Sequence, residues 1–329
     1  MVAGILAIRW SPAWWLDPLF SLVIGHSLAC IAFLSHDLSH NTIIRNRSLR
    51  YAAETIFMGL LLFPPTLWRR LHNQTHHLNA NTVEDPDRHF LESEASLGTR
   101  WYTRFFHLHR RSSTLWNILK WNPLTAGQFI AYTVRNLIAA FVSDSPSAPT
   151  IPYKPEYTRA QKWQMSFELV VIVLLQVAIF MAVGARVGPY LFASLASYLV
   201  TSAILTAYIY THHGINPMVE TNDPVLSSTS IVVWPFIDKI HHHFSYHTEH
   251  HLFPGMNSDY YPLVSRILME KFPTRYNRIG FREAWRRIAE HDEFMADSEI
   301  IRASRPSEDA PSEPAHPTEP TKPGELIER

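Results

Sequence analysis

Cysteine and charge are both scarce in this sequence. Only one of its 329 residues is a cysteine, Cys30, which excludes an intrachain disulfide framework, a thiolate zinc cluster and a cysteine-ligated iron–sulfur centre. Charged residues make up 18% of the chain, below the quarter that is typical of soluble domains. The 29 basic residues balance the 29 acidic ones, so a net basic field that would attract nucleic acid is also excluded. The low charge favours a membrane protein.

Long uncharged runs support this interpretation. Residues 169–185 and 187–210 are apolar. At about 1.5 Å per residue, each run crosses or nearly crosses a hydrocarbon core of about 30 Å. Together they predict a helical hairpin through a membrane. A third apolar helix is predicted over residues 19–34, and it continues without a breaker into His36 and His40.

Other segments complete the predicted organisation. Residues 1–16 are apolar and rich in tryptophan, and they form either a short span or an interfacial segment. Residues 51–65 are too short for a span and end in two prolines, which favours a membrane-surface or re-entrant piece. Residues 281–289 carry an apolar stripe that predicts an amphipathic helix on the body or on lipid. Residues 297–329 are rich in Pro, Glu, Ser and Thr, so we expect one domain over residues 1–296 and a disordered tail after it.

Positive charge predicts the orientation of the chain. The block between residues 45 and 162 is rich in Arg and Lys, and the positive-inside rule places it in the cytoplasm. Because two spans separate this block from everything after residue 210, the chain returns to the same side. Mean hydropathy is only −0.07, so a large polar part lies outside the bilayer. We therefore expect an all-α integral membrane protein with a helical cap on the cytoplasmic side.

Histidine is abundant, with 19 copies, and it gathers in clusters on the predicted cytoplasmic side. The three clearest clusters are His36-Asp-Leu-Ser-His40, His72-Asn-Gln-Thr-His76-His77 and His247-Thr-Glu-His250-His251. On a helix, positions i, i+3 and i+4 share a face, so each cluster can aim two or three imidazoles at one point. An HxxxH pattern is expected about once by chance at this histidine content, but HxxxHH or HxxHH only about 0.06 times each. The second and third clusters therefore indicate metal ligation.

The number and type of ligands indicate the kind of metal site. Eight imidazoles exceed the roughly four ligands of one zinc ion, so two metal ions are predicted. All-nitrogen ligation beside a membrane favours a redox pair and oxygen chemistry over a zinc hydrolase, and the HExxH motif of zincin proteases is absent. A metal transporter is disfavoured because the two clearest spans carry no histidine.

Histidines outside the three clusters receive other interpretations. We interpret His26, on the predicted first span, as a packed or hydrogen-bonded helix histidine rather than a ligand. His241, His242 and His243 are assigned a supporting role around the site or a structural role, because enough ligands are already available.

Over about residues 19–276 the chain resembles the membrane fatty acid desaturase family. The resemblance rests on the three clusters and on their neighbours, which are Asn41, Arg47 and Glu54 after the first cluster, Trp68 before the second, Asp85-Pro86-Asp87 after the second, and Leu252-Phe253-Pro254 after the third. The Leu-Phe-Pro ending is among the most specific parts of the family pattern.

The resemblance implies two iron ions held by cytoplasmic histidines above a base of about four transmembrane helices. It also implies dioxygen as the oxidant and an external electron donor of the ferredoxin or cytochrome b5 type, since the sequence contains no His-Pro-Gly-Gly motif of a fused cytochrome b5 domain. Relatives often take a ninth ligand from just after the last span, and His212 matches that place best. The implied metal ligands are His36, His40, His72, His76, His77, His212, His247, His250 and His251.

The implied activity is the oxygen-dependent introduction of a double bond into a fatty acyl lipid or thioester. A hydroxylase, a ketolase and an oxidative decarboxylase remain open alternatives, because the same ligands serve all of them. Asp37, Asp85 and Glu249 are near the ligands in sequence and are candidates for orienting imidazole N–H groups, although surface carboxylates are common. We expect a membrane protein with its active site on the cytoplasmic side and no nucleic-acid partner.

Overall fold

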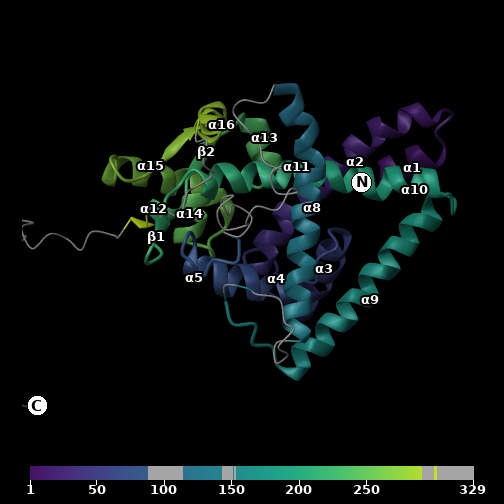
Figure 1. Cartoon of the computed structure of the whole chain (residues 1–329), viewed down its shortest axis with the longest axis horizontal. Coiled ribbons are helices and arrows are strands. Elements are labelled where there is room, and N and C mark those ends of the chain that lie inside the picture. The colour runs from purple at the N-terminus through teal and green to yellow at the C-terminus, as the bar shows by residue number, and fades with distance from the viewer. Residues whose placement is uncertain (88–113, 143–150, 152, 291–299, 302–329) are drawn as a thin grey trace, which may run out of the picture.

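The computed structural model of the chain describes residues 1–87, 114–142, 151, 153–290 and 300–301. It is mostly helical, at 70%, as the sequence predicts, and Figure 1 shows its elements. The elements up to the third span are α1 (Val2–Arg9), η1 (Trp14–Leu16), α2 (Asp17–Ser39), α3 (Arg47–Leu60), α4 (Pro65–Trp68), η2 (Arg69–His76), α5 (His77–Asn79), α8 (Thr114–Phe141), α9 (Arg159–Ala182), α10 (Val187–Leu191), η4 (Phe192–Ala196) and α11 (Ser197–Ile209). The elements after it are η5 (Tyr210–Gly214), β1 (Met218–Val219), α12 (Pro224–Ser227), β2 (Ser230–Val232), α13 (Pro235–Ile240), α14 (His247–Leu252), η6 (Ser258–Tyr260), α15 (Tyr261–Lys271), β3 (Arg278–Gly280), α16 (Phe281–Glu290) and β4 (Ile300–Ile301).

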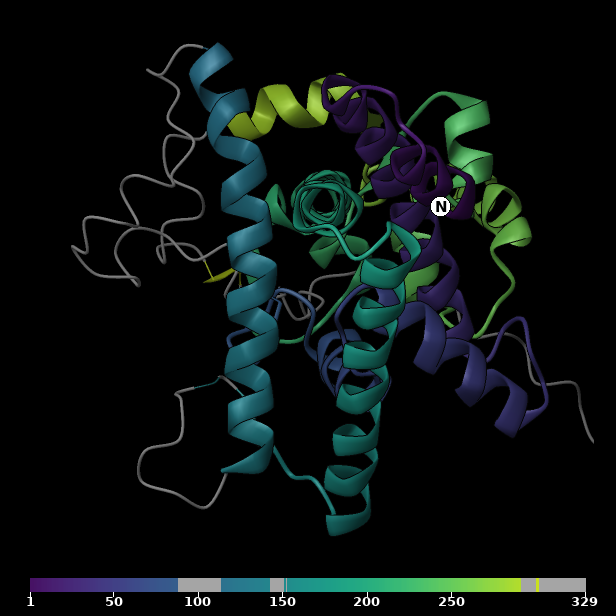
Figure 2. The ribbon, with the colours of Figure 1, turned by 90° about the vertical axis from the view of Figure 1, so that its right-hand side faces the viewer.

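Among the described residues, three helical stretches are long and apolar enough to cross a membrane: Trp14–Ser39, Arg159–Ala182 and Val187–Gly214. They correspond to the three runs expected from the sequence, although the helix over the run 169–185 ends at Ala182. Helix α8 is also long, and it passes along one side of α11, which Figure 2 views nearly end on. Only Phe129–Phe141 of α8 forms an apolar stretch, so a base of four spans stays a prediction.

Helices α2 and α11 pack closely because small residues line their contact. A Cβ added to Gly25 would lie 2.6 Å from the Ser197 carbonyl oxygen, a distance that real Cβ atoms do not reach. Across the same contact, the Thr201 hydroxyl donates a hydrogen bond of 2.9 Å to the Gly25 carbonyl oxygen. Small residues that let two helix backbones approach are typical of helix packing in membranes. The contact holds α2 and α11 side by side.

Helix α9 diverges from its partner in the predicted hairpin. Figure 1 shows α9 running obliquely away from α10 and α11, and α9 packs instead against α3 and α4. Near the turn, the Gln176 side chain accepts hydrogen bonds from Tyr190 and Ser194 at 3.0 and 2.8 Å, which joins the two helices where they are closest. Several large apolar side chains of α9, such as Trp163 and Val173, are exposed. A long exposed apolar surface of this kind is suited to lipid.

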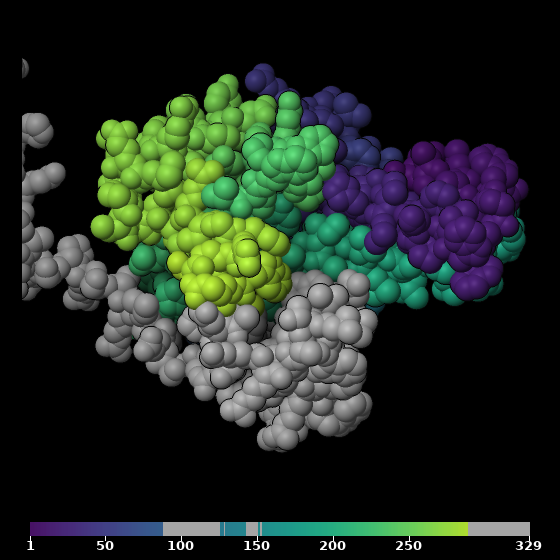
Figure 3. All heavy atoms as spheres, turned by 90° about the horizontal axis from the view of Figure 1, so that it is seen from above, coloured from purple at the N-terminus to yellow at the C-terminus, as the bar shows by residue number. Residues whose placement is uncertain are grey.

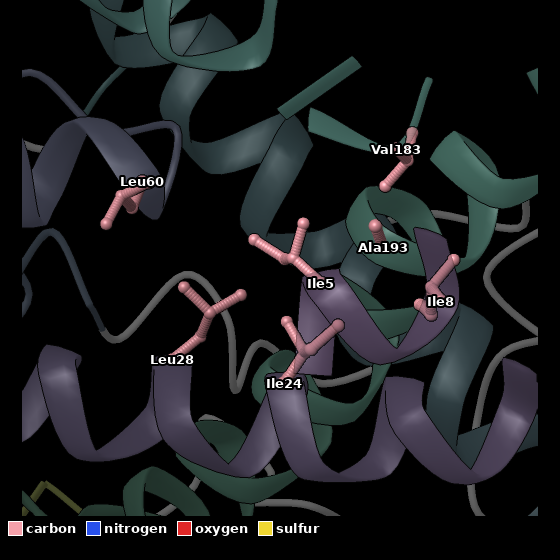
Figure 4. Close-up of a cluster of buried hydrophobic side chains, with 7 residues drawn as sticks. All are labelled: Ile5, Ile8, Ile24, Leu28, Leu60, Val183 and Ala193. Atoms are coloured by element: carbon pink, nitrogen blue, oxygen red, sulfur yellow. The ribbon is translucent and has the colours of Figure 1, made fainter. Parts of the chain in front are cut away.

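The N-terminal segment packs on neighbouring helices rather than spanning a membrane. Helix α1 has eight residues, which at 1.5 Å per residue is about 12 Å long and too short to cross a membrane. Figure 4 shows the apolar cluster in which it takes part, formed by Ile5, Ile8, Ile24, Leu28, Leu60, Val183 and Ala193. Of the two interpretations of residues 1–16, the structure therefore supports a packed segment that does not span. Trp10, Trp14 and Trp15 remain exposed beside it.

The elements after α11 gather at the opposite end of the molecule from the N-terminal helices (Figure 3). Two short parallel ladders join them, with β1 beside β4 and β2 beside β3. Helix α16 buries Ala284 and Ile288 against this body, as its apolar stripe predicts. Of the predicted tail, only residues 300 and 301 are described, and they form β4. Residues 297–299 and 302–329 lie outside the described residues, so the disorder of the tail stays a prediction.

Candidate metal centre

The three histidine clusters come together from four separate helical elements. His36 lies in the last turn of α2 and His40 at its C-cap, where Asn41 adopts the left-handed conformation (φ 65°) that ends the helix. The second cluster lies on η2 and α5, and the third on α14. Both η2 and η5 are π-helical, and such turns are frequent at functional sites. The buried Glu54 on α3 forms an ion pair with Arg69, which joins η2 to α3.

The first group of converging side chains is the five-histidine group. Its members are His36, His40, His72, His77 and His250, and one ring nitrogen of each lies within 4.8 Å of the others. The Nε2 atom of His77 is 3.2 Å from that of His72 and 3.0 Å from that of His250. The indole of Trp68 stacks on His72, with ring centroids 4.5 Å apart.

The second group is the four-histidine group. Its members are His76, His213, His247 and His251, all of them buried and again within 4.8 Å of one another. The Nε2 atom of His247 is 2.7 Å from that of His213 and 3.1 Å from that of His251. The two groups adjoin, because the rings of His77 and His251 have centroids 4.4 Å apart. The structure thus brings the second and third clusters into direct contact.

The two adjacent histidines of η5, His212 and His213, have different surroundings. The sequence favours His212 as the ninth ligand, whereas the structure places His213 in the four-histidine group. The Nδ1–H of His213 donates to the Ser227 carbonyl oxygen at 3.1 Å, which leaves Nε2 for the group. His212 is fully buried and stacks on His247, with centroids 4.2 Å apart, but it belongs to neither group.

The sequence carries no signal that distinguishes the two histidines. Both follow the α11 residues Leu205 and Ile209 at a spacing of three, four, seven or eight, and both line one cavity with them. The helical face alone therefore does not favour either residue.

Burial keeps most of these imidazoles neutral, which is the form that ligates a metal. It lowers the pKa of His40 to about 2, and it holds the pKa values of His72, His77, His247, His250 and His251 well below the ordinary value. Neighbouring imidazoles act in the same direction, because each disfavours a second positive charge close by.

His76 differs because carboxylates lie next to it. Burial alone would lower its pKa, but Asp85 and Asp87 outweigh burial and raise the pKa of His76 to about 9. Its Nδ1 is 2.8 Å from Asp85 Oδ1. Burial likewise favours a raised pKa for the Asp85 carboxyl, but His76 holds that pKa below its ordinary value. The buried aspartate is therefore ionised and orients the imidazole.

Backbone groups fix Asp85 in this position. Its two oxygens accept hydrogen bonds of 2.8 and 2.9 Å from the N–H groups of Asn81 and Asp87. Asn81 has φ 58° and donates from its side chain to the His213 carbonyl oxygen at 3.1 Å. One turn therefore connects the second cluster to the end of α11.

The other two candidate orienting carboxylates behave differently. Asp37 Oδ1 is 3.4 Å from Nδ1 of His36, a long contact. Glu249 is fully buried and accepts hydrogen bonds from Ser230 and Tyr276. Glu249 therefore joins α14 to β2 and to the segment before β3, while Nδ1 of His250 lies 3.0 Å from the Tyr261 hydroxyl.

An apolar cavity opens between the two groups. Six histidines line it: His36, His72, His76, His212, His213 and His247. Most of the remaining wall is aromatic or aliphatic and includes Phe33, Met58, Phe129, Leu205, Ile209 and Phe244. Along α11 the lining reaches from His213 back to Tyr198, about 20 Å at 1.5 Å per residue. The cavity therefore combines an elongated apolar space with a histidine-rich end.

The fold and the site together define a helical membrane protein in which histidines suited to metal ligation adjoin an apolar cavity. The chain belongs to the fatty acid desaturase family, whose model matches residues 12–282. This confirms the resemblance stated from the histidine clusters. The chain is also similar to dihydrorhizobitoxine desaturase of Bradyrhizobium elkanii, with 28% identity over 122 residues. That match covers 36% of this chain and 32% of the relative, so the chain spans about a third of the relative's length.

The residues present fit a pair of iron ions. Nine converging imidazoles form a donor set suited to iron. Within the described part of the chain, Nε2 of His36 and of His40 are buried and have no hydrogen-bond partner. Unpaired buried nitrogens are costly, and ligation of a metal would satisfy both of them.

Proposed function

We propose that this protein is an oxygen-dependent desaturase that introduces a double bond into a fatty acyl chain with a histidine-ligated pair of iron ions. The observation that carries the proposal is the convergence of nine imidazoles, in adjoining groups of five and four, at the end of an apolar cavity. Membership of the fatty acid desaturase family supports it.

The protein side chains would position the reactants. The five-histidine group and the four-histidine group would each hold one ion, with His213 as the ninth ligand in place of His212. When bound, the iron pair would supply the activation of dioxygen that removal of hydrogen from an unactivated methylene requires. Asp85 would keep the Nδ1–H of His76 oriented so that Nε2 faces the ion.

The cavity would select and align the substrate. Phe33, Leu205 and Ile209 offer an apolar wall along α11, which suits a hydrocarbon chain and excludes water from the reacting carbons. The polar end of a lipid or thioester would remain outside this wall. We propose a fatty acyl substrate on this basis, although the related enzyme is named for another compound, dihydrorhizobitoxine.

The remaining parts of the proposal concern the surroundings of the site. We propose a base of four membrane helices, with α8 as the fourth, and a cytoplasmic site, because the block between residues 45 and 162 is rich in Arg and Lys. Two electrons per turnover would come from a separate ferredoxin or cytochrome b5 type protein.

Product analysis tests the proposal. The full chain would be expressed with iron in a host of known lipid composition, and fatty acids, hydrocarbons and polar metabolites would be compared by mass spectrometry with those of a matched His250→Ala host. A desaturase yields acyl products lighter by two hydrogens in the wild type alone. Products heavier by one oxygen would indicate the hydroxylase alternative, and shortened hydrocarbons would indicate the decarboxylase.

A further inference from the structure

A third set of potential metal ligands lies outside both histidine groups. His26 and Cys30 are one turn apart on α2, and His241 follows α13. One ligand atom of each lies within 4.8 Å of the others. The Nε2 atoms of His26 and His241 are 3.2 Å apart, and Cys30 Sγ is 3.9 Å from Nδ1 of His26.

The separation of the two imidazole nitrogens matches that of ligands on one ion. Two imidazole nitrogens bound to tetrahedral zinc at about 2.0–2.1 Å lie roughly 3.3 Å apart. The His26–His241 separation is close to this value. It also equals the 3.2 Å between Nε2 of His72 and Nε2 of His77 inside the five-histidine group.

The surroundings of His241 prepare its ring for ligation. Its Nδ1 is 2.8 Å from the Tyr208 hydroxyl, and the tautomer that donates Nδ1–H to the phenol oxygen leaves the lone pair of Nε2 facing His26. A hydrogen bond to the far nitrogen is the usual way in which a ligating histidine is fixed. His241 is buried, while His26 and Cys30 are partly exposed on the surface of α2.

Two aromatic rings separate this cluster from the five-histidine group. The ring of Phe33 contacts His241 and Phe244, with centroids 4.8 and 4.6 Å apart, and Phe244 in turn contacts His36 at 5.0 Å. An ion between His26, Cys30 and His241 would therefore be additional to the two ions of the proposed function.

We propose that His26, Cys30 and His241 bind a single zinc ion that fastens the cap to membrane helix α2. One thiolate and two imidazoles form a donor set of the kind that zinc takes, and they leave one of its four positions to a further ligand. The segment that follows His241 carries Phe244 and leads into the third histidine cluster on α14. Zinc at this place would hold that segment against α2.

The single cysteine makes a specific test possible. Because Cys30 is the only thiol in the chain, a thiolate-to-cobalt charge-transfer band in the near ultraviolet can arise only at this cluster. The full chain would be purified in lipid nanodiscs, loaded with iron and then titrated with Co²⁺. In parallel samples titrated with Zn²⁺, zinc and iron per chain would be measured by mass spectrometry.

The expected result is a cobalt–thiolate band and about one zinc per chain in the iron-loaded wild type. Cys30→Ser should abolish the band, and both Cys30→Ser and His26→Ala should weaken zinc binding at least about tenfold while bound iron stays unchanged. Matched controls are Ser27→Ala on the same helix turn and His242→Asn beside His241, and both should keep zinc and the band.

Two results would overturn the proposal. One is a wild type with neither band nor extra zinc, and the other is zinc binding that is the same in Cys30→Ser and His26→Ala as in the controls. Iron content and lipid products of the same samples report separately on the desaturase proposal. A chain that lacks iron or products but keeps the Cys30-dependent band would therefore support the zinc site while contradicting the desaturase.

Discussion

The four-histidine group and the five-histidine group use the same side chain but are anchored by different partners. In the four-histidine group, His76 contacts the ionised Asp85 at 2.8 Å and His213 donates to a backbone carbonyl oxygen. In the five-histidine group, the nearest carboxylate oxygens are 3.4 Å from His36 and 3.9 Å from His72, beyond good hydrogen-bond distance. A buried anion thus supports one group, and mainly neutral contacts support the other.

This difference predicts two metal positions of unequal strength. A carboxylate on the far nitrogen of an imidazole raises the basicity of that ligand and fixes its ring. All members of the four-histidine group are also buried, whereas His40 and His77 of the other group are only partly buried. We therefore expect the ion of the four-histidine group to be held more tightly and to exchange more slowly. The following predictions test this inequality, beginning with the largest effect.

Removal of a central ligand should have the largest effect. His247→Ala deletes the ring that joins His213 and His251 within the four-histidine group, so we expect one of about two bound irons to be lost and activity to fall at least about 100-fold. Iron per chain and product yield measure this. The control is His242→Asn, since asparagine tolerates the left-handed φ of 55° at that position. Full iron content in His247→Ala would contradict the assignment of this group.

The adjacent histidines of η5 provide a matched pair. His213→Ala should lose the ion of the four-histidine group and reduce activity about 100-fold, because Nε2 of His213 is 2.7 Å from that of His247. His212→Ala should retain both irons, because His212 only stacks on His247. Iron analysis of the two variants side by side decides between them. Equal losses, or a larger loss in His212→Ala, would restore His212 as the ninth ligand.

The case of His213 shows how far the sequence alone could predict the site. The spacing within the three clusters, together with helical periodicity, predicts that each cluster presents its imidazoles on one face, and the structure places eight of the nine predicted residues in the two groups. The choice between His212 and His213 depends on the rotation of a π-helical end, and local spacing does not determine it. From the sequence, Asp37, Asp85 and Glu249 are equal candidates for orienting an imidazole. The turn at Asn81 brings Asp85 within 2.8 Å of His76, and the sequence does not predict this distance.

The fold was predictable to a similar extent. Long apolar runs predict α2, α9 and α11 because length and composition decide whether a helix can span a membrane. The divergence of α9 from α11 was not predictable, since it depends on the packing of α9 against α3 and α4. For the same reason, the contribution of α1 to the apolar cluster could not be derived from its own short sequence.

Loss of the buried anion tests the inequality of the two groups directly. Asp85→Asn keeps the size of the side chain but removes the charge that orients His76, so metal affinity in the four-histidine group should fall roughly 10- to 100-fold. A chelator titration that measures the iron remaining per chain checks this. The ion of the four-histidine group should then no longer leave more slowly than the ion of the five-histidine group. Asp37→Asn is the matched control in the other group, and its effect should be smaller because the Asp37–His36 contact is long.

The smallest effect is expected from the neutral partner of the five-histidine group. Tyr261→Phe removes the hydroxyl that lies 3.0 Å from Nδ1 of His250, and the loss of one neutral hydrogen bond costs about 1 kcal/mol, or roughly a 3- to 10-fold change in affinity or rate. The ring of Tyr261 would still fill its buried place, so the cap should keep its structure, which thermal unfolding can check. Measured beside Asp85→Asn in the same chelator titration, Tyr261→Phe should accelerate release of the weaker ion only slightly. If the two variants lost iron equally, the ionised aspartate would contribute no more than a phenol does, and the two metal positions would have to be treated as equivalent.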